Sequence, residues 1–192
     1  MQDDTYYIDR ILKGDVSAYT ILVDRHKRAV YTFILKMVKV PEDAEEIAHD
    51  AFVKAYQSLG SFKNQSKFST WLFRIAFNET VSRLRKKKHD VVSLDEQKFS
   101  YLEVSDTENI LNELDELEKQ ETVRLAVDKL SDIDRSLITL YYNQDCSIKE
   151  IAEIMKLSES NVKIKLFRAR KQLWEKLKHV FKDKVIPEYN GK

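Results

Sequence analysis

The chain has 192 residues, of which 43% are hydrophobic and 34% are charged, and its formal net charge is +1. This composition is typical of a soluble globular protein with one or two domains, and the single cysteine, Cys146, excludes an internal disulfide and fits a reducing cytosol. No apolar run reaches the roughly 18 residues that a membrane span needs, and residues 1–15 lack the pattern of a signal peptide, so we expect a cytoplasmic protein.

Helices are predicted for most of the chain, because three glycines and two prolines leave few positions that break a helix. A first bundle is expected over residues 10–89. Helices are expected at 16–38, 41–59 and 68–88 within it, and a short helix at 4–13 begins before it. Gly14 ends the first of these segments, Pro41 suits the first turn of the third, and Gly60 ends the third. The fold class that follows is all-α.

The segment 41–59 combines an apolar stripe with a run of acids. Its apolar residues follow the i, i+3, i+4 spacing of one buried helix face. Residues 41–50 contain five acidic residues and no lysine or arginine. Because such a cluster is costly unless a basic partner meets it, we expect this helix to present a docking face.

The segment that follows is basic and aromatic. Residues 62–89 contain eight Lys or Arg residues and one acid, Glu79. Aromatic rings beside cations suit single-stranded nucleic acid, because bases stack on the rings while cations follow the phosphates. Each ring taken singly also fits a core position, and Trp71 and Ile75 lie one helical turn apart, as core residues do.

An acidic, flexible linker is predicted at 90–106, where no helical period is sustained. Residues 90–121 contain eleven acids and two lysines. A second helical bundle is expected over 107–182, beginning with a helix near Thr107 and carrying serine caps at Ser131, Ser147 and Ser158. Its last part is basic again, and two basic blocks separated by an acidic one fit a protein that touches a polyanion in two places.

Residues 147–173 match the spacing of a helix-turn-helix unit. A capping box of Ser147 and Glu150 opens the first helix, and a short turn leads to a second helix that is basic. That second helix keeps Ile164 and Phe167 among its cations. In DNA-binding units it lies in the major groove, where cations meet phosphates and guanine edges and an apolar group can meet a thymine methyl. For this segment alone, a helical hairpin with a solvated basic face is the alternative.

Catalysis has no support in the sequence. There is no Gly-rich phosphate loop, and the four histidines and Cys146 are not at metal-ligand spacing. His49 and Asp50 beside Glu46 could form an acid–base site, but the polar face of an amphipathic helix is the simpler interpretation. We expect no enzymatic activity, no metal and no cofactor.

Three motifs, taken in order, resemble those of the extracytoplasmic-function sigma factors, the smallest group of the bacterial sigma-70 family. DAEEIAHDAF is similar to the family's D-A-E-D-hydrophobic-x-Q-E-x-F signature, with His49-Asp50 where Gln-Glu is usual. FSTWLFRIAFN resembles F-x-T-W-L-x-R-I-A-x-N, and SESNVKIKLFRARKQL resembles S-x-x-T-V-K-x-R-hydrophobic-x-R-A-R. The resemblance covers residues 10–180, nearly the whole chain.

The resemblance implies that the two bundles are sigma regions 2 and 4 of a transcription initiation factor. The residues implied to dock on the clamp helices of RNA polymerase's largest subunit are Asp43, Glu46, Asp50, Phe52 and Tyr56. Those implied to open and hold the minus-ten element are Phe62, Lys63, Ser69, Thr70, Trp71, Arg74, Asn78, Arg83 and Arg85. Those implied to contact the minus-thirty-five element are Ser160, Asn161, Lys163, Ile164, Phe167 and Arg168.

The partners that the resemblance implies are core RNA polymerase, through its clamp helices and flap region, promoter DNA, and an anti-sigma factor. The acidic linker is implied to thread the polymerase's RNA path. A stand-alone helix-turn-helix regulator is the alternative, and it explains 147–173 but gives no reason for the acidic helix or the aromatic–basic helix. A helical enzyme is a third class, which lacks any site.

Overall fold

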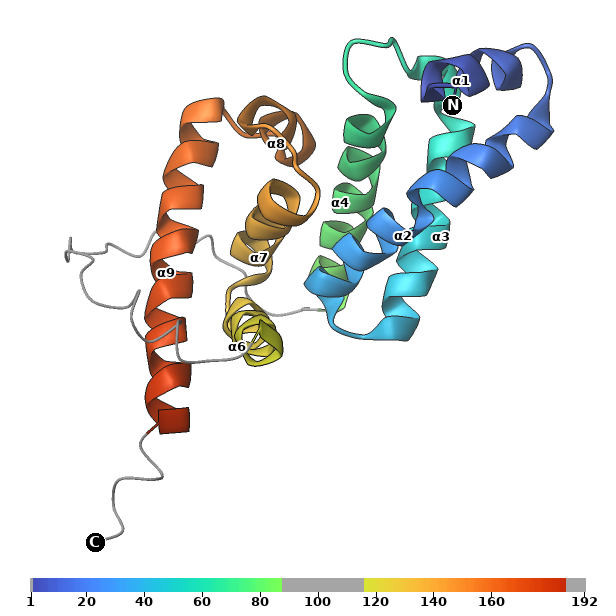
Figure 1. Cartoon of the computed structure of the whole chain (residues 1–192). Coiled ribbons are helices and arrows are strands. Elements are labelled where there is room, and N and C mark those ends of the chain that lie inside the picture. The colour runs from blue at the N-terminus through green and yellow to red at the C-terminus, as the bar shows by residue number, and fades with distance from the viewer. Residues whose placement is uncertain (1, 88–115, 186–192) are drawn as a thin grey trace, which may run out of the picture.

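The computed structural model describes residues 2–87 and 116–185, and every regular element within these ranges is a helix (Figure 1). The predicted linker 90–106 and the predicted helix start near Thr107 lie outside the described residues. In chain order the elements are α1 (Asp4–Leu12), η1 (Val16–Ala18), α2 (Tyr19–Val38), α3 (Pro41–Gln57), η2 (Leu59–Ser61), α4 (Phe68–Lys87), α6 (Glu116–Asp128), α7 (Asp132–Ile138), η3 (Thr139–Asn143), α8 (Ile148–Met155) and α9 (Glu159–Val185). The all-α prediction is confirmed. None of the helices in the described ranges is long and apolar enough to span a membrane.

The first bundle packs α2, α3 and α4 around one apolar core, with α1 against α2. The buried stripe of α3 is largely alanine, which lets the neighbouring helices approach closely, and it matches the predicted apolar face. Ile8 and Ile11 of α1 are buried in the same core, so the bundle includes residues before the predicted start at residue 10.

The predicted helix ends are present as hydrogen bonds. Ser131 Oγ accepts from the Asp134 backbone N–H, and Ser147 and Glu150 form a reciprocal capping box at the start of α8. Ser158 Oγ accepts from the backbone N–H of Asn161 at 3.2 Å. These caps satisfy N–H groups that the helices themselves leave without partners.

One element differs from the sequence-based expectation. The pattern over 133–144 indicates a single α-helix, but α7 ends at Ile138 and η3 continues it as one π-helical turn. Tyr141 and Tyr142 lie on this turn, and the Arg170 guanidinium of α9 stands over both rings, 5.0 and 5.5 Å from their centroids. The wider turn brings two adjacent rings to one cation, an arrangement that residue periodicity does not predict.

The two bundles share one continuous core, because α7 packs on α2 and α8 packs on α4 (Figure 1). Arg135 of α7 is 1% exposed, and its guanidinium donates to the Lys36 carbonyl of α2 at 2.8 Å and to the Leu130 carbonyl at 2.5 Å. Lys39 Nζ, at the end of α2, donates to the Asp128 carbonyl at 2.8 Å. The sequence predicted two bundles, and the structure adds a specific contact between them.

Candidate nucleic-acid interface

The aromatic residues of the predicted minus-ten set form a packed cluster at the start of α4. The ring of Trp71 lies 5.4 Å from that of Phe62 and 5.8 Å from that of Phe68, centroid to centroid. Trp71 is 6% exposed and Phe68 is 4% exposed, so both serve the core in this conformation. Phe62 is partly exposed and is the ring of this cluster that solvent can reach.

The polar residues of the same set lie along a different stripe of α4. Thr70, Arg74, Asn78 and Arg85 follow one another at spacings of four, four and seven residues, which places them on one helix face. This stripe faces α8. Asn78 and Arg85 line a pocket of about 640 Å³ whose other residues include Met155 of α8.

Two acids of α8 contact the N-terminal half of this stripe and the loop that precedes α4. Glu150 accepts from Thr70 Oγ1 at 3.3 Å and lies 2.9 Å from Lys67 Nζ. Glu153 accepts from Ser66 Oγ at 2.9 Å and lies 3.6 Å from an Arg74 nitrogen. Among the other predicted residues, Lys63 is exposed and Ser69 is half-buried.

The charge on Glu150 is held by its hydrogen bonds. Burial raises the pKa of this carboxyl, but the Ser147 backbone N–H, Lys67 and the Ser147 hydroxyl outweigh burial, and the pKa falls to about 2. The pKa of Lys67 is raised in turn by its hydrogen bond to Glu150. Glu150 is therefore ionised at neutral pH and faces the basic side of the first bundle.

The predicted polymerase-binding residues of α3 fall on two edges of its exposed side. Asp43, Glu46 and Asp50 recur at three and four residues and form one edge, which we call the acidic edge. Phe52 and Tyr56 lie about half a turn away, since each residue advances the helix by about 100°. The sequence motif thus contributes to two surfaces rather than one.

The acidic edge already holds a cation of the predicted minus-ten set. The Arg83 guanidinium of α4 forms an ion pair with Glu46. That hydrogen bond is the main cause of the raised pKa of Arg83, and the charges of Asp50 and Asp43 add to it. In this conformation Arg83 links α4 to α3 and neutralises part of the acidic edge.

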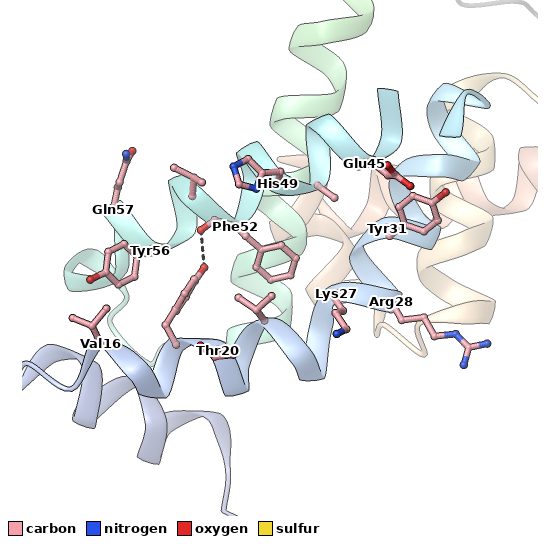
Figure 2. Close-up of a pocket in the computed structure, with 14 residues that line it drawn as sticks. Val16, Thr20, Lys27, Arg28, Tyr31, Glu45, His49, Phe52, Tyr56 and Gln57 are labelled. Atoms are coloured by element: carbon pink, nitrogen blue, oxygen red, sulfur yellow. Dashed lines mark hydrogen bonds between the residues drawn. The ribbon is translucent and has the colours of Figure 1, made fainter. Parts of the chain in front are cut away.

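An apolar groove of about 950 Å³ lies between α2 and α3 (Figure 2). Tyr19 of α2 donates its hydroxyl to the Phe52 carbonyl across the groove at 2.6 Å, and burial raises the pKa of Tyr19. Phe52 is only 9% exposed and contributes to the floor, whereas Tyr56 is 38% exposed at one end. Figure 2 shows His49 and Glu45 along the α3 side, with Lys27 and Arg28 on α2.

This groove was not recognised from the sequence. The sequence did contain a sign of this groove. Val53 and Tyr56 are apolar residues outside the buried stripe of α3, and the apolar residues that line the opposite wall include Val16, just before α2, and Tyr19, at the start of α2. Only the packing angle of the two helices turns these separate residues into one concave surface.

The outward face of α9 carries the predicted minus-thirty-five residues. Val162, Leu166 and Ala169 are buried, which leaves the opposite side of the helix to solvent. Ile164 is 52% exposed and Phe167 is 58% exposed. The remaining predicted residues of this set are also exposed, namely Ser160, Asn161, Lys163 and Arg168.

The described residues contain no cluster of three or more His, Cys, Asp or Glu side chains that could hold a metal ion. Cys146 is buried between the bundles, and burial raises the pKa of its thiol to about 11. What this part of the chain offers is a set of charged and apolar surfaces, namely the acidic edge, the apolar groove, the α4 stripe and the α9 face.

Two family models match the chain, sigma-70 region 2 over residues 22–89 and sigma-70 region 4 over residues 120–173. The ECF RNA polymerase sigma factor SigW of Bacillus subtilis is 35% identical over 178 residues, which cover 89% of this chain and 95% of that protein. The ECF RNA polymerase sigma-E factor of Escherichia coli K12 is 32% identical, with 91% of this chain and 94% of that protein covered.

Solved structures show the same architecture. RpoE of Bartonella quintana, in complex with the anti-sigma factor NepR, matches with a TM-score of 0.63 and 25% identity, over 83% of this chain and 96% of that chain. CnrH, in complex with the cytosolic domain of CnrY, matches with a TM-score of 0.65 and 24% identity, over 92% of this chain and 97% of that chain.

Proposed function

The chain belongs to the extracytoplasmic-function sigma factors of the sigma-70 family and is a transcription initiation factor, and from this premise we propose how its surfaces divide the work. The observation that carries the proposal is that one chain joins a region 2 match, with its acidic edge and groove, to a region 4 match with an outward basic helix. A stand-alone regulator is not favoured, because it leaves the region 2 half without a role.

Core RNA polymerase binds, in this proposal, to the first bundle through α3. The acidic edge of Asp43, Glu46 and Asp50 supplies charge that steers a basic partner, and the neighbouring groove supplies apolar area. Phe52 and Tyr56 act through the groove. A helix with apolar side chains fits such a groove. The clamp of the largest subunit presents helices of this kind.

Promoter DNA contacts both halves by different chemistry. The bundle predicted at 10–89 opens and binds the minus-ten element through the α4 stripe, Lys63 and the partly exposed ring of Phe62. Three further residues support this surface, namely Ser69, Trp71 and Arg83. The bundle predicted at 107–182 places α9 in the major groove of the minus-thirty-five element. Exposed Ile164 and Phe167 suit thymine methyl groups, and Lys163 and Arg168 suit phosphates or guanine edges.

An anti-sigma factor is a further proposed partner. RpoE of Bartonella quintana, which is similar in fold and sequence, was solved in complex with one. We further propose that the chain works in the cytoplasm, where polymerase and DNA lie, and that it has no catalytic step of its own.

The test is transcription in vitro with the purified chain, core polymerase and a pool of promoter fragments. We expect transcripts that appear only when both the chain and core polymerase are present. If the chain binds promoter DNA without core polymerase, and core polymerase does not change that binding, the stand-alone regulator is supported. Asn78→Ala is expected to keep the closed complex and to impair melting, because it removes a polar group from the α4 stripe.

Pre-melted templates should rescue Asn78→Ala, and Asn143→Ala on η3 is the matched control. Permanganate footprinting measures melting directly. Normal thymine reactivity with Asn78→Ala on duplex templates contradicts the role given to the α4 stripe.

A further inference from the structure

His26 of α2 lies at the end of the aromatic cluster that the proposed function assigns to opened DNA. Its ring is 5.5 Å from the ring of Phe68, centroid to centroid. Phe68 in turn lies 5.8 Å from both Phe62 and Trp71. Phe68 and Trp71 are buried, whereas Phe62 is partly exposed. A row of rings therefore leads from His26 to the ring on which a base could stack.

Asp4, in the first turn of the N-terminal helix α1, fixes the orientation of the His26 ring. His26 Nε2 donates to Asp4 Oδ2 at 2.7 Å, and Arg25 Nη1 donates to Asp4 Oδ1 at 3.0 Å. Between 16% and 23% of each of these three side chains is exposed, so water competes weakly for the contact. Consecutive helix residues diverge by about 100°, and one carboxylate that joins both of them leaves His26 little freedom to turn.

Further contacts attach α1 to the same end of the first bundle. The Arg25 guanidinium stands over the ring of Tyr7, 4.7 Å from its centroid. Ile8 and Ile11 are buried in the core of the first bundle. Helix α1 also packs on η2, the turn that leads into the loop before α4, and Figure 1 shows α1 at the same end of the bundle as this loop. Asp4 is therefore held in place on the side of α1 that faces α2.

Phe62 depends on the aromatic cluster for its direction, because it begins the loop between η2 and α4. Its backbone is extended, and its N–H donates to the Leu59 carbonyl at 3.0 Å. The loop residues that follow, 63–65, are exposed. The packing of rings is thus what sets the direction of the Phe62 side chain. A ring that is ordered before a base arrives loses less conformational entropy when the base stacks on it.

We propose that His26 is a positioning residue for base stacking. Held by Asp4, its ring keeps Phe68 in place, and the packed cluster keeps Phe62 ready for an unpaired base of the minus-ten element. The inference rests on the proposed function of the first bundle. It gives a role in DNA opening to α1, most of which precedes the region 2 match that begins at residue 22.

The experiment uses variants of the full-length chain that separate positioning from general support of the fold. Asp4→Leu removes both hydrogen bonds, and His26→Leu removes the donor and the ring. Asp4→Asn is the conservative variant, because its amide keeps an oxygen for Arg25 and an N–H group for a neutral His26. The matched control is Asp15→Leu, at the other end of α1, which also removes one acid with two partners, Arg10 and Ser17.

The first readout is the rate of open-complex formation with saturating core polymerase, on a promoter fragment selected by the transcription assay. Asp4→Leu and His26→Leu are expected to open it about fivefold to tenfold more slowly, because a misdirected ring loses part of a stacking contact. Asp4→Asn and Asp15→Leu should open it at the wild-type rate. Closed-complex affinity should be the same in all chains, and pre-melted templates should remove the defect.

The second readout is acrylamide quenching of Trp71 fluorescence in the free chain. The chain has two tryptophans, so a Trp174→Phe background leaves Trp71 as the single emitter. Quenching is expected to rise in Asp4→Leu and His26→Leu and to stay unchanged in Asp4→Asn and Asp15→Leu. Urea denaturation measures the stability of each chain, and it shows whether slower opening merely follows a loss of stability.

Two results overturn the inference. One is unchanged Trp71 quenching in both Asp4→Leu and His26→Leu. The other is an opening defect that follows the loss of stability in every variant, Asp15→Leu included. A failure of the proposed function looks different: the wild type with core polymerase opens no promoter fragment, although Trp71 quenching changes as expected. In that case the cluster is positioned by His26 but does not serve DNA opening, and the inference is wrong as well.

Discussion

Glu150 is one side chain with two structural duties. It completes the capping box that starts α8, and it holds Lys67 and Thr70 of the first bundle. Sequence analysis identified the first duty from the Ser147–Glu150 spacing. The second depends on residues about eighty positions away in the chain and needs the packing of α8 on α4.

The contribution of Glu150 to stability should depend on pH. Its folded pKa of about 2 lies below the ordinary value of 4.5, so its ionised form stabilises the fold above the ordinary pKa, and this contribution is lost as the pH falls toward 2. Glu150→Gln is expected to lower the free energy of unfolding by about 1 kcal/mol at about pH 7. The difference, measured by urea denaturation, should shrink steadily below about pH 4. A difference that stays constant down to about pH 2 contradicts this account.

Arg135 should be the most costly side chain to remove at the junction of the bundles. Its guanidinium is 1% exposed and is satisfied by carbonyls of both bundles. Arg135→Met leaves several buried carbonyls without donors and is expected to lower the free energy of unfolding by at least about 3 kcal/mol. Arg124→Met, which removes an exposed arginine that pairs with Glu121, should cost less than about 1 kcal/mol. Equal losses in the two variants, measured by urea denaturation, are the contrary result.

Helix α3 is a single amphipathic helix with two chemically different surfaces, and we propose that both bind polymerase. Its buried alanine stripe fixes the helix in the bundle, and the acidic edge and the groove lie on opposite edges of the side that remains exposed. The groove depends on α2 as much as on α3, since Tyr19 and Val23 form its other wall.

A charge placed in the groove should block polymerase binding without unfolding the chain. Val53 lines the groove and is 40% exposed, so Val53→Glu is expected to reduce affinity for core polymerase at least tenfold by desolvating a charge in an apolar contact. Val123→Glu on α6, also 40% exposed, is the matched control and should bind normally. Co-elution with core polymerase on size exclusion measures both. Full binding by Val53→Glu removes the groove from the interface.

Helix α9 should contact bases, whereas the end of α4 should contact phosphates. Arg168→Ala is expected to cost about 1–3 kcal/mol and to relax specificity at one position of the upstream element. Lys86→Ala should weaken binding of all sequences alike and lower the salt slope by about one unit. Competition binding over a set of single-base changes distinguishes them. If Arg168→Ala weakens every sequence equally, Arg168 contacts a phosphate.

The molecule as a whole is held in one arrangement by contacts at both ends of the junction between its bundles. Cys146 lies at this junction, where the charges of Glu150 and Lys67 both act on its thiol. It is the single cysteine of the chain, so its reaction with a thiol reagent reports on this place alone.

The rate at which the Cys146 thiol reacts should therefore report any separation of the two bundles at this junction. It is 8% exposed, and its pKa of about 11, raised first by burial, leaves little thiolate at neutral pH. We expect slow reaction with a thiol reagent in the free chain and a rate several-fold higher in Glu150→Gln/Glu153→Gln. Adding core polymerase to the wild type should also raise the rate. A rate that is equal in all three samples shows that the junction does not open at Cys146.

The sequence alone determined the helical class, the order of most helices, their caps and the face of α9 that points outward. These features are local: periodicity, breakers and side-chain caps act within a few residues of each other, so Ser147 with Glu150 or Val162 with Leu166 can be recognised without a fold. The family also followed from the sequence, because its motifs are short and ordered along the chain.

Only the tertiary structure decided which residues meet across the chain. It placed Trp71 in the core, split the α3 motif between two surfaces, paired Arg83 with Glu46 and laid α8 over the α4 stripe. Each of these depends on the packing of helices that are distant in sequence, and helical periodicity gives the direction of a side chain without naming the partner that it meets. Glu153 has the same local sequence pattern whether its side chain faces water or Arg74. Only the position of α4 in the fold distinguishes the two cases.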